Sequence, residues 1–401
     1  MRIGIDFTAA AHQGGGIGRL TRNVVGALAE IDRENEYRLF VAAGRGRKGE
    51  WQVGSLGAAF QASGYANFEL KTVPLSDHAL AVAWHRLRLP LFAELFTGRI
   101  DLFHSPDFTL PPVWRAKSVV TVHDLSFLRL PACFPEGLLR YLEAAVPRAV
   151  RRADRVIADS HSTCRDLIEL LGTPAHKITV IHSGVEPRFR PMTGETDRET
   201  LAAAGRKYSL PERFILSVGT IQPRKNLGCL IQAFSMLNAR CPSLDLELVI
   251  AGGRGWLYEG ILEQVKALGL EGRVRFLGFV DDVDLPALYN LAGLFAFPSL
   301  YEGFGLPPLE AMACGVPVVC SNASSLPEVV GDAALTFDPL DVEGLAEAMR
   351  RGIEDEALRT SLVAQGLARA AAFTWPKAAH ELLAVYTSMT RDRAGSFDER
   401  L

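Results

Sequence analysis

The chain has 401 residues, of which 48% are hydrophobic and 22% are charged, proportions that are typical of a folded globular protein. A chain of this length is longer than one that folds around a single hydrophobic core, and it suits two domains of near-equal size. The 43 basic and 46 acidic residues give a net charge of −3, so no bulk electrostatic field favours nucleic acid or an anionic membrane.

The six cysteines form no C-x-x-C pair, which argues against a zinc site or a redox motif and makes a reduced, cytoplasmic compartment the expectation. At the N-terminus, the apolar run in MRIGIDF is broken by Asp6, so a strand is expected there rather than a signal peptide. No apolar stretch reaches the roughly 18 residues of a membrane span. Any membrane association is therefore expected to be peripheral, at the inner face.

The first half alternates short β-branched runs with amphipathic helical stretches such as IGRLTRNVVGALAEI and EGLLRYLEAAVPRAVRRA. Seven strands are expected, in RIGIDF, YRLFVAA, FELKTVP, IDLFHSP, KSVVTVHD, DRVIADS and ITVIHSGV. Such alternation requires crossover connections, and it therefore predicts a parallel sheet that is covered on both faces.

Over residues 187–211 the alternation lapses into EPRFRPMTGETDRETL, whose proline, glycine and charge indicate a linker. Six further strands are expected in FILSVGT, LELVIAGG, VRFLGFV, LFAFPS, PVVCS and ALTFD. The predicted fold class is α/β, with two doubly wound, Rossmann-like domains at 1–187 and 188–371 and a ligand cleft at their strands' carboxyl ends. Residues 372–401 are expected to form a helix that packs back towards the first domain and ends in a frayed tail, RDRAGSFDERL.

The stretch YEGFGLPPLEAMACG places Glu302 and Glu310 around a short loop between an expected strand and an expected helix. Gly303 and Gly305 permit close backbone approach, and the loop amides with the helix N-terminus favour an anion such as a diphosphate. The two carboxylate oxygens of Glu310 could accept hydrogen bonds from a vicinal diol of the ligand, and Glu302 could bind hydroxyls further along the same ligand. Taken alone, a capped helix with two solvated glutamates explains the motif about as well.

With this E-x7-E motif the chain resembles the retaining glycosyltransferases of family 4, which have the two-domain GT-B fold. Ordered motifs extend the resemblance over nearly the whole chain: GGGIGRLTRNVVGAL, VVTVHDLSFL, ADRVIADSHSTCRDL, HKITVIHSGVEPRFRP, ILSVGTIQPRKNL, LVIAGGRGW and VRFLGFVDDVDLPALY. VHDLSF and GTIQPRKN look most like bacterial mannosyltransferases that build O-antigen and related polysaccharides from GDP-mannose. The resemblance implies a nucleotide-diphosphate sugar as donor, a saccharide or lipid-linked saccharide as acceptor, no required cofactor and no metal.

Arg224 and Lys225 follow the first strand of the second domain, where two cations would neutralise a diphosphate. Many relatives have an arginine directly after the strand's glycine, where this chain has Thr220, and a solvated pair at a helix start is the alternative. The donor contacts expected from the residues and the resemblance together are Gly16, Arg224, Lys225, Gly278, Phe279, Val280, Glu302, Gly303, Phe304, Gly305, Leu306 and Glu310.

His123 and Asp124 end a first-domain strand in VTVHDL. The resemblance implies that His123 lies beside the donor sugar and is needed for turnover, although a histidine at a strand terminus is more often structural. The catalytic candidates are His123, Glu302, Lys225 and Arg224. The acceptor-side candidates are Gly15, Gly16, His104, Asp124 and His182.

Three other patterns are discounted. HQGGGIGR lacks the third glycine of G-x-G-x-x-G, so a dinucleotide site is not expected. Asp282 or Asp284 suits a helix N-cap better than a metal site. The basic stretch around Arg151 suits a solvated helix face better than a lipid contact.

The sequence therefore predicts a retaining α-glycosyltransferase, with mannose and GDP-mannose indicated only by the branch that it resembles. Because both motif glutamates are committed to binding, front-face departure is favoured over a covalent intermediate. The open alternatives are a UDP-sugar such as UDP-glucose as donor, an epimerase or phosphorylase relative, and an inactive nucleotide-sugar-binding protein.

Overall fold

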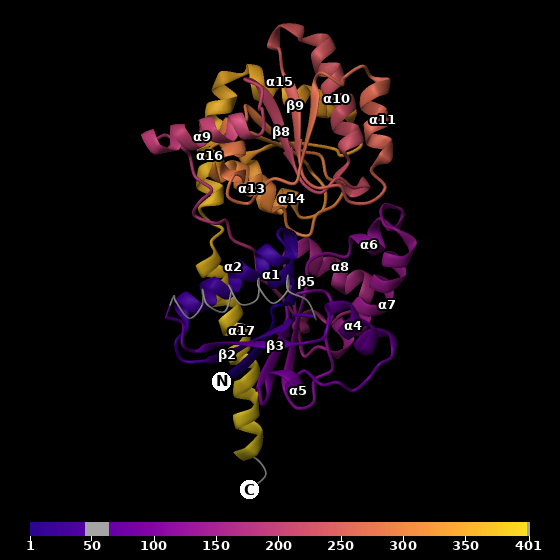
Figure 1. The fold of residues 1–401 in the computed structure, drawn as a ribbon, viewed down its shortest axis with the longest axis vertical. Helices are drawn as coiled ribbons and strands as arrows, with labels where there is room; N and C mark the ends of the chain where they lie inside the picture. The colour runs from indigo at the N-terminus through magenta and orange to yellow at the C-terminus, as the bar shows by residue number, and fades with distance from the viewer. Residues whose placement is uncertain (45–63, 399–401) are drawn as a thin grey trace. The chain divides into compact units, whose positions relative to one another are not determined.

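The computed structural model of the chain describes residues 1–44 and 64–398 (Figure 1). By contacts the chain divides into two compact units. The first unit comprises Met1–Leu125, Arg140–Gly184 and Trp375–Leu401, and the second comprises Ser126–Leu139 and Val185–Thr374. Each unit contains one wholly parallel sheet.

Within the described residues, the sheet of the first unit has seven strands in the order β3-β2-β1-β4-β5-β6-β7. The strands are β1 (Arg2–Asp6), β2 (Glu36–Ala42), β3 (Phe68–Val73), β4 (Leu102–Ser105), β5 (Lys117–Val122), β6 (Arg155–Ala158) and β7 (Ile178–Val180). All seven predicted strands are confirmed. Ile3 of β1 pairs with Tyr37 on one side and with Leu102 on the other, so the strand order reverses between β1 and β4.

The sheet of the second unit has six strands in the order β10-β9-β8-β11-β12-β13. They are β8 (Phe214–Val218), β9 (Glu247–Ala251), β10 (Val274–Gly278), β11 (Leu294–Phe297), β12 (Val318–Ser321) and β13 (Leu335–Phe337), and all six were predicted. Alternate strand residues enter two different cores: Leu216 packs in one, and its neighbour Ile215 packs in the other. Because both faces are covered, these strands are apolar throughout, as expected of a parallel sheet.

The predicted amphipathic helices correspond to α2 (Gly16–Ile31), α7 (Glu136–Arg152) and α17 (Trp375–Asp398). The last of these, α17, lies beside α2 in the first unit (Figure 1). It contributes Trp375, Leu382 and Tyr386 to the core of that unit. The helix continues through most of the predicted frayed tail, and only residues 399–401 of that tail lie outside the described residues.

The predicted linker at 187–211 is wrong in its centre, because α9 (Glu195–Lys207) forms there. The Asp197 carboxylate accepts a hydrogen bond from the Gly194 amide and forms an ion pair with Arg190. These two contacts fix the first turn of α9. Ala204 is buried, and α9 packs on α12 (Leu285–Leu291). Its polar sequence resembled a linker because only one side of the helix is covered.

The observed units also differ from the predicted boundaries at residues 126–139, which belong with the second unit rather than the first. This segment contains α6 (Ser126–Arg129) and η2 (Pro131–Cys133). The indole N–H of Trp256 donates to the Cys133 carbonyl at 2.7 Å, and the rings of Phe134 and Trp256 lie 6.0 Å apart. Such a long-range contact has no local sequence signal.

Candidate active site

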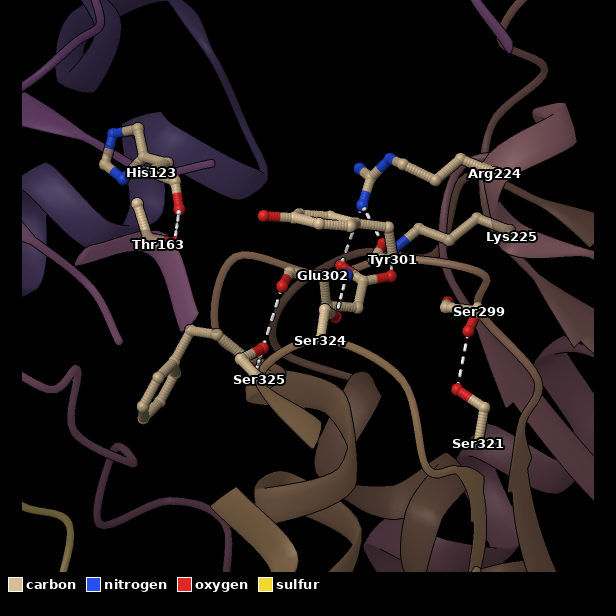
Figure 2. A network of polar contacts seen from close by, with 11 residues as sticks. His123, Thr163, Arg224, Lys225, Ser299, Tyr301, Glu302, Ser321, Ser324 and Ser325 are labelled. Atoms are coloured by element: carbon tan, nitrogen blue, oxygen red, sulfur yellow. Dashed lines mark hydrogen bonds and ion pairs between the residues drawn. The ribbon is translucent and has the colours of Figure 1, made fainter. Parts of the chain in front are cut away.

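The loops that follow β8 and β11 leave the second sheet where its strand order reverses, a position at which open α/β sheets bind ligands. The short turn η4 (Pro223–Lys225) follows β8. Nη1 of Arg224 donates to Oε2 of Glu302 at 3.1 Å and to the Tyr301 carbonyl at 2.6 Å. Nζ of Lys225 donates to Oε1 of Glu302 at 2.6 Å. The structure thus brings three predicted catalytic residues into one cluster, which Figure 2 shows in close-up.

This cation–glutamate cluster is nearly dry, with side-chain exposures of 14% for Arg224, 13% for Lys225 and 10% for Glu302. Burial by itself would raise the pKa of Glu302, but the charges of Lys225 and Arg224 outweigh burial and lower the pKa to about 2. Lys225 Nζ also lies 4.9 Å from the centroid of the Phe297 ring, a cation–π distance. Two cations and one carboxylate leave the cluster with a net positive charge, which suits a phosphate group.

The loop from Glu302 to Gly305 is held by two serines that sequence analysis missed. The Glu302 amide donates to Ser324 Oγ at 2.7 Å, and Ser325 Oγ lies within hydrogen-bond distance of the Glu302 and Phe304 carbonyls, at 2.8 and 2.6 Å (Figure 2). Gly305 has φ +119°, and an added Cβ would lie 2.8 Å from Leu326. Only glycine therefore fits at this entry to α13 (Leu306–Ala313). A possible signal was the polar SNASS stretch directly after the neighbouring strand β12.

Glu310 lies on α13 and is 1% exposed. Its Oε2 accepts a hydrogen bond from the Tyr289 hydroxyl at 3.0 Å, so Tyr289 of α12 is a second partner that the sequence did not reveal. A ribose contact for Glu310 stays a prediction, and it would have to be made by a carboxylate that is already anchored.

The end of β10 leads into three of the expected donor contacts, Gly278, Phe279 and Val280. Phe279 is 64% exposed, whereas the Val280 side chain is buried in the core, so Val280 could contact a donor only through its backbone, and these contacts stay predictions. The Gly278 carbonyl accepts a hydrogen bond from the Gly252 amide at 2.8 Å.

The acidic pair that was discounted as a metal site lies just before α12. Asp284 occupies the N-cap position, as expected, but its side chain does not cap the helix. Its carboxylate instead accepts hydrogen bonds from Lys207 Nζ at 2.5 Å and from the Tyr208 hydroxyl at 2.8 Å. The Asp282 carbonyl accepts a hydrogen bond from Arg188. These contacts give the acidic residues a structural role.

In the first unit, the glycine-rich loop after β1 leads into α2. Gly15 is the N-cap and Gly16 has φ +52°, and neither would meet a neighbour within 4 Å if a Cβ were added. The space beside them is open, as a close ligand contact requires. Arg22 holds this loop by donating to the carbonyls of Ala10 and Gln13 at 2.8 and 2.7 Å, and sequence analysis did not single it out.

His123 follows β5 and is buried. Its Nδ1 lies 2.7 Å from Oδ2 of Asp159, and its Nε2 lies 2.9 Å from the Pro106 carbonyl. Both partners are acceptors, so both ring nitrogens must carry protons. Burial would lower the pKa of His123, but the Asp159 carboxylate outweighs burial and raises the pKa to about 9. His123 is therefore an imidazolium at neutral pH, and the missed residue Asp159 keeps it so.

His104, predicted as an acceptor contact, stays a prediction, and its ring is already engaged within the fold. His104 is 3% exposed, and its two ring nitrogens are occupied by the Tyr386 hydroxyl at 2.6 Å and the Thr121 hydroxyl at 2.8 Å. No ring nitrogen remains for a saccharide. Asp124 and His182 are partly exposed, and their roles stay predictions.

The His123–Asp159 pair should make stability depend on pH. The pKa of His123 in the folded chain is about 9, which is above the usual value near 6.5. The pair therefore stabilises the fold fully below about pH 6.5, and this stabilisation is lost as pH rises through about 9. Urea unfolding across this range should show the advantage of wild type over His123→Gln shrinking by at most about 3 kcal/mol. His380→Gln, at an exposed histidine of α17, is the control. A pH-independent difference between wild type and His123→Gln would contradict the imidazolium assignment.

Comparison with known proteins decides the family. The glycosyltransferase family 4 model matches residues 14–189, and the model of glycosyl transferases group 1 matches residues 203–369. O-antigen chain mannosyltransferase B of Escherichia coli is 37% identical over 286 residues, which cover 71% of this chain and 74% of that protein. The chain belongs to glycosyltransferase family 4. This glycosyltransferase is accordingly assigned to the hexosyltransferases, as the sequence predicted.

Other relatives of this glycosyltransferase carry different names. The serotype-specific mannosyltransferase WbdA of Escherichia coli is 39% identical over 239 residues, which cover 59% of this chain but only 29% of WbdA. A D-inositol 3-phosphate glycosyltransferase of Salinispora tropica is 34% identical over 311 residues, covering 72% of this chain and 64% of that protein. The names agree on glycosyl transfer and differ in the substrates they state.

Solved structures confirm the predicted GT-B fold of this glycosyltransferase. Sucrose-phosphate synthase of Thermosynechococcus elongatus superposes with a TM-score of 0.73 at 20% identity, covering 98% of this chain and 100% of the other. WaaG, a glycosyltransferase of lipopolysaccharide biosynthesis, gives 0.71 at 16% identity and covers 96% and 99%. At such identities the likeness concerns the fold alone.

Proposed function

We propose that this glycosyltransferase is a retaining α-mannosyltransferase, which moves mannose from GDP-mannose to a lipid-linked or growing saccharide in cell-surface polysaccharide synthesis. The observation that carries the proposal is the cluster of Arg224, Lys225 and Glu302 at the reversal point of the second sheet. The names of the Escherichia coli relatives support mannose as the transferred sugar.

In this proposal Arg224 and Lys225, together with the amides from Gly303 to Leu306, hold the donor diphosphate. Glu302 binds hydroxyls of the transferred sugar, and Glu310 binds the ribose. Because Glu302 already pairs with both cations, the diphosphate must compete with Glu302 for them. For His123 and Gly16, the resemblance implies donor contacts.

The proposed reaction proceeds on one face of the sugar. The bond between the anomeric carbon and the phosphate oxygen breaks, and the departing phosphate oxygen takes the proton of the acceptor hydroxyl. That hydroxyl oxygen then bonds to the anomeric carbon from the same face, which retains its configuration. The protein contributes positioning and stabilisation of the leaving charge. Since cations and backbone amides serve the diphosphate, we expect chelators to leave the rate unchanged.

Donor identity is tested by thermal unfolding with GDP-mannose, UDP-glucose and ADP-glucose. A ligand at a hundred times its Kd stabilises the native state by about 2.7 kcal/mol, so GDP-mannose should give the largest shift, and a neutral acceptor should then gain mannose. A larger rise in unfolding temperature with UDP-glucose would overturn the assignment of GDP-mannose as the donor. Binding without transfer to any acceptor would indicate an inactive binding protein, and conversion of the donor alone would indicate an epimerase.

We also propose peripheral membrane association through the first unit. No helix in the described part of the chain is both long and apolar enough to span a bilayer. However, Leu87, Leu95 and Trp114 are 60%, 65% and 66% exposed, and they lie on two stretches joined by the ring contact of Phe92 with Trp114 at 4.9 Å. The same stretches carry the exposed arginines Arg86, Arg88, Arg99 and Arg115. Exposed apolar side chains among cations suit an anionic lipid interface.

Vesicle sedimentation tests this association. We expect the protein to sediment with vesicles that contain phosphatidylglycerol and to remain in solution with phosphatidylcholine alone. The double variant Leu95→Ser, Trp114→Ser should bind at least tenfold more weakly, since burial of each side chain is worth about 1.5–3 kcal/mol. Leu340→Ser is the matched control, because Leu340 is 80% exposed in the second unit. Equal loss in both variants would contradict the proposed surface.

A further inference from the structure

The first unit contains a cavity of about 360 Å³ that none of the predicted site residues line. It lies where β1 and β4 end, which is the reversal point of this sheet, and it falls within the usual size range of small-molecule sites, roughly 300–1,000 Å³. Its walls come from the residues after β1, the segment 107–111, the turn of α4 (Asp77–Ala81) and η1 (Val82–Arg86), and α7. It is therefore a second candidate ligand site, within one unit.

The polar lining of this cavity is acidic. Asp6, Asp77 and Asp107 all line it, and no lysine or arginine is among the described lining residues. Burial raises the pKa of Asp6 to about 6, and the negative charges of Asp107 and Asp77 add to that rise. Burial also raises the pKa of Asp107, whereas the charge of His123 opposes that rise. The Asp107 carboxylate has no hydrogen-bond partner among the residues the structure describes, whereas Asp6 accepts one from the Thr8 amide at 3.0 Å.

The remaining lining includes two histidines, His12 and His85, and aromatic rings. Nε2 of His12 lies 2.8 Å from the Ala42 carbonyl. Trp84 and Tyr141 contribute rings, and the Trp84 indole N–H is already used by the Leu91 carbonyl at 2.8 Å, so Trp84 offers a mainly apolar face. Burial and the positive charges of Arg148 and Arg152 lower the pKa of His85 to about 4. His85 is therefore neutral at pH 7 and cannot serve as a phosphate-binding cation.

We infer that this cavity binds an uncharged, hydroxyl-rich ring of the acceptor saccharide and discriminates against phosphorylated saccharides. Carboxylates accept hydrogen bonds from sugar hydroxyls, and a ring such as that of Trp84 can pack against the apolar face of a sugar. A phosphate in the same space would face three carboxyl groups and no lysine or arginine of the lining. The nearby cations are already engaged, His123 by Asp159 and the two arginines Arg148 and Arg152 by backbone carbonyls, so the carboxyl groups repel the phosphate. This inference rests on the proposed function, since it specifies which acceptors the proposed transferase accepts.

The test measures saccharide binding by titration calorimetry with saturating GDP and no donor sugar. The probes are neutral disaccharides of mannose, glucose, galactose and N-acetylglucosamine, each with its 6-phosphorylated counterpart. At least one neutral disaccharide should bind at least tenfold more tightly than its phosphorylated form. Asp107→Asn should weaken that binding by about tenfold or more, as expected for a lost hydrogen bond to a charged group. Asp77→Lys should improve binding of the phosphorylated form at least tenfold.

Glu36→Gln is the matched control, because Glu36 is exposed and begins β2 at the opposite end of the sheet. This variant should bind like wild type, and GDP should stabilise all variants equally against heat. Absence of binding by every neutral probe, equal binding of the phosphorylated probes, or an unchanged affinity in Asp107→Asn would each overturn the inference. If a neutral saccharide binds as expected but mannose is never transferred, the proposed function fails while the cavity assignment stands.

Discussion

Replacing Lys225 by alanine is expected to reduce transferase turnover about 10²–10³-fold, the usual effect of removing one group that stabilises transition-state charge. Lys225 is one of two cations in the cluster, and its Nζ lies 2.6 Å from Glu302. Without it, the departing diphosphate would lose a partner whose position is already fixed by Glu302 and the Phe297 ring. The measurement is kcat for mannose transfer from GDP-mannose at saturating acceptor.

The fold should survive this change, because Arg224 remains bound to Glu302 and to the Tyr301 carbonyl. We expect urea unfolding to show a loss of about 1–3 kcal/mol, the range for one broken buried polar contact. Lys207→Ala is the control, since Lys207 is 49% exposed and pairs with Asp281 and Asp284 away from the cluster. Near-normal turnover in Lys225→Ala, or equal losses in both variants, would refute the role of Lys225.

Glu302→Gln is expected to have opposite effects on binding and on transfer. The glutamine keeps the shape but removes the negative charge that pairs with Arg224 and Lys225. GDP, which carries the diphosphate but not the transferred sugar, should then bind about 5- to 30-fold more tightly, because one unit of competing charge is worth roughly 1–2 kcal/mol there. Transfer should nevertheless fall at least a hundredfold, since the proposed contact to the sugar hydroxyls is weakened.

Calorimetric titration with GDP measures the expected gain in affinity, and a transfer assay on the same preparation measures the expected loss of transfer. Glu343→Gln serves as the control, because Glu343 is exposed and pairs with Arg240. Since the pKa of Glu302 is about 2, the contrast between wild type and Glu302→Gln should hold at every pH where the protein is folded. Weaker GDP binding in Glu302→Gln would show that Glu302 assists the diphosphate rather than competing with it.

Every strand of both sheets could be predicted, because strands buried on both faces are short runs of apolar, largely β-branched residues bounded by glycine, proline or charge. The helix α9 was missed for the converse reason. It is polar along most of its length, and its start at Gly194 depends on a side-chain contact to Asp197. The placement of residues 126–139 depends on Trp256, a partner more than a hundred positions away.

The motifs located the second-unit cluster but did not reveal how its members pair. Arg224, Lys225 and Glu302 were predicted from strand ends and from E-x7-E, whereas their mutual ion pairs depend on which strands are neighbours. The supporting groups Ser325, Tyr289 and Asp159 carry no motif of their own. The contacts of His104 with the Tyr386 and Thr121 hydroxyls were likewise not predicted, because one partner lies 282 positions away in the sequence.

The position of α17 has a consequence for biosynthesis. The helix is made after the whole of the second unit, yet it places Trp375, Leu382 and Tyr386 in the core of the first unit. Domains that are contiguous in sequence can fold as they emerge from the ribosome, but here the first unit must wait for a helix that is made after the second unit. Until α17 has been made, the first unit lacks the helix that covers α2, so nascent chains should depend on chaperones more than the finished enzyme does.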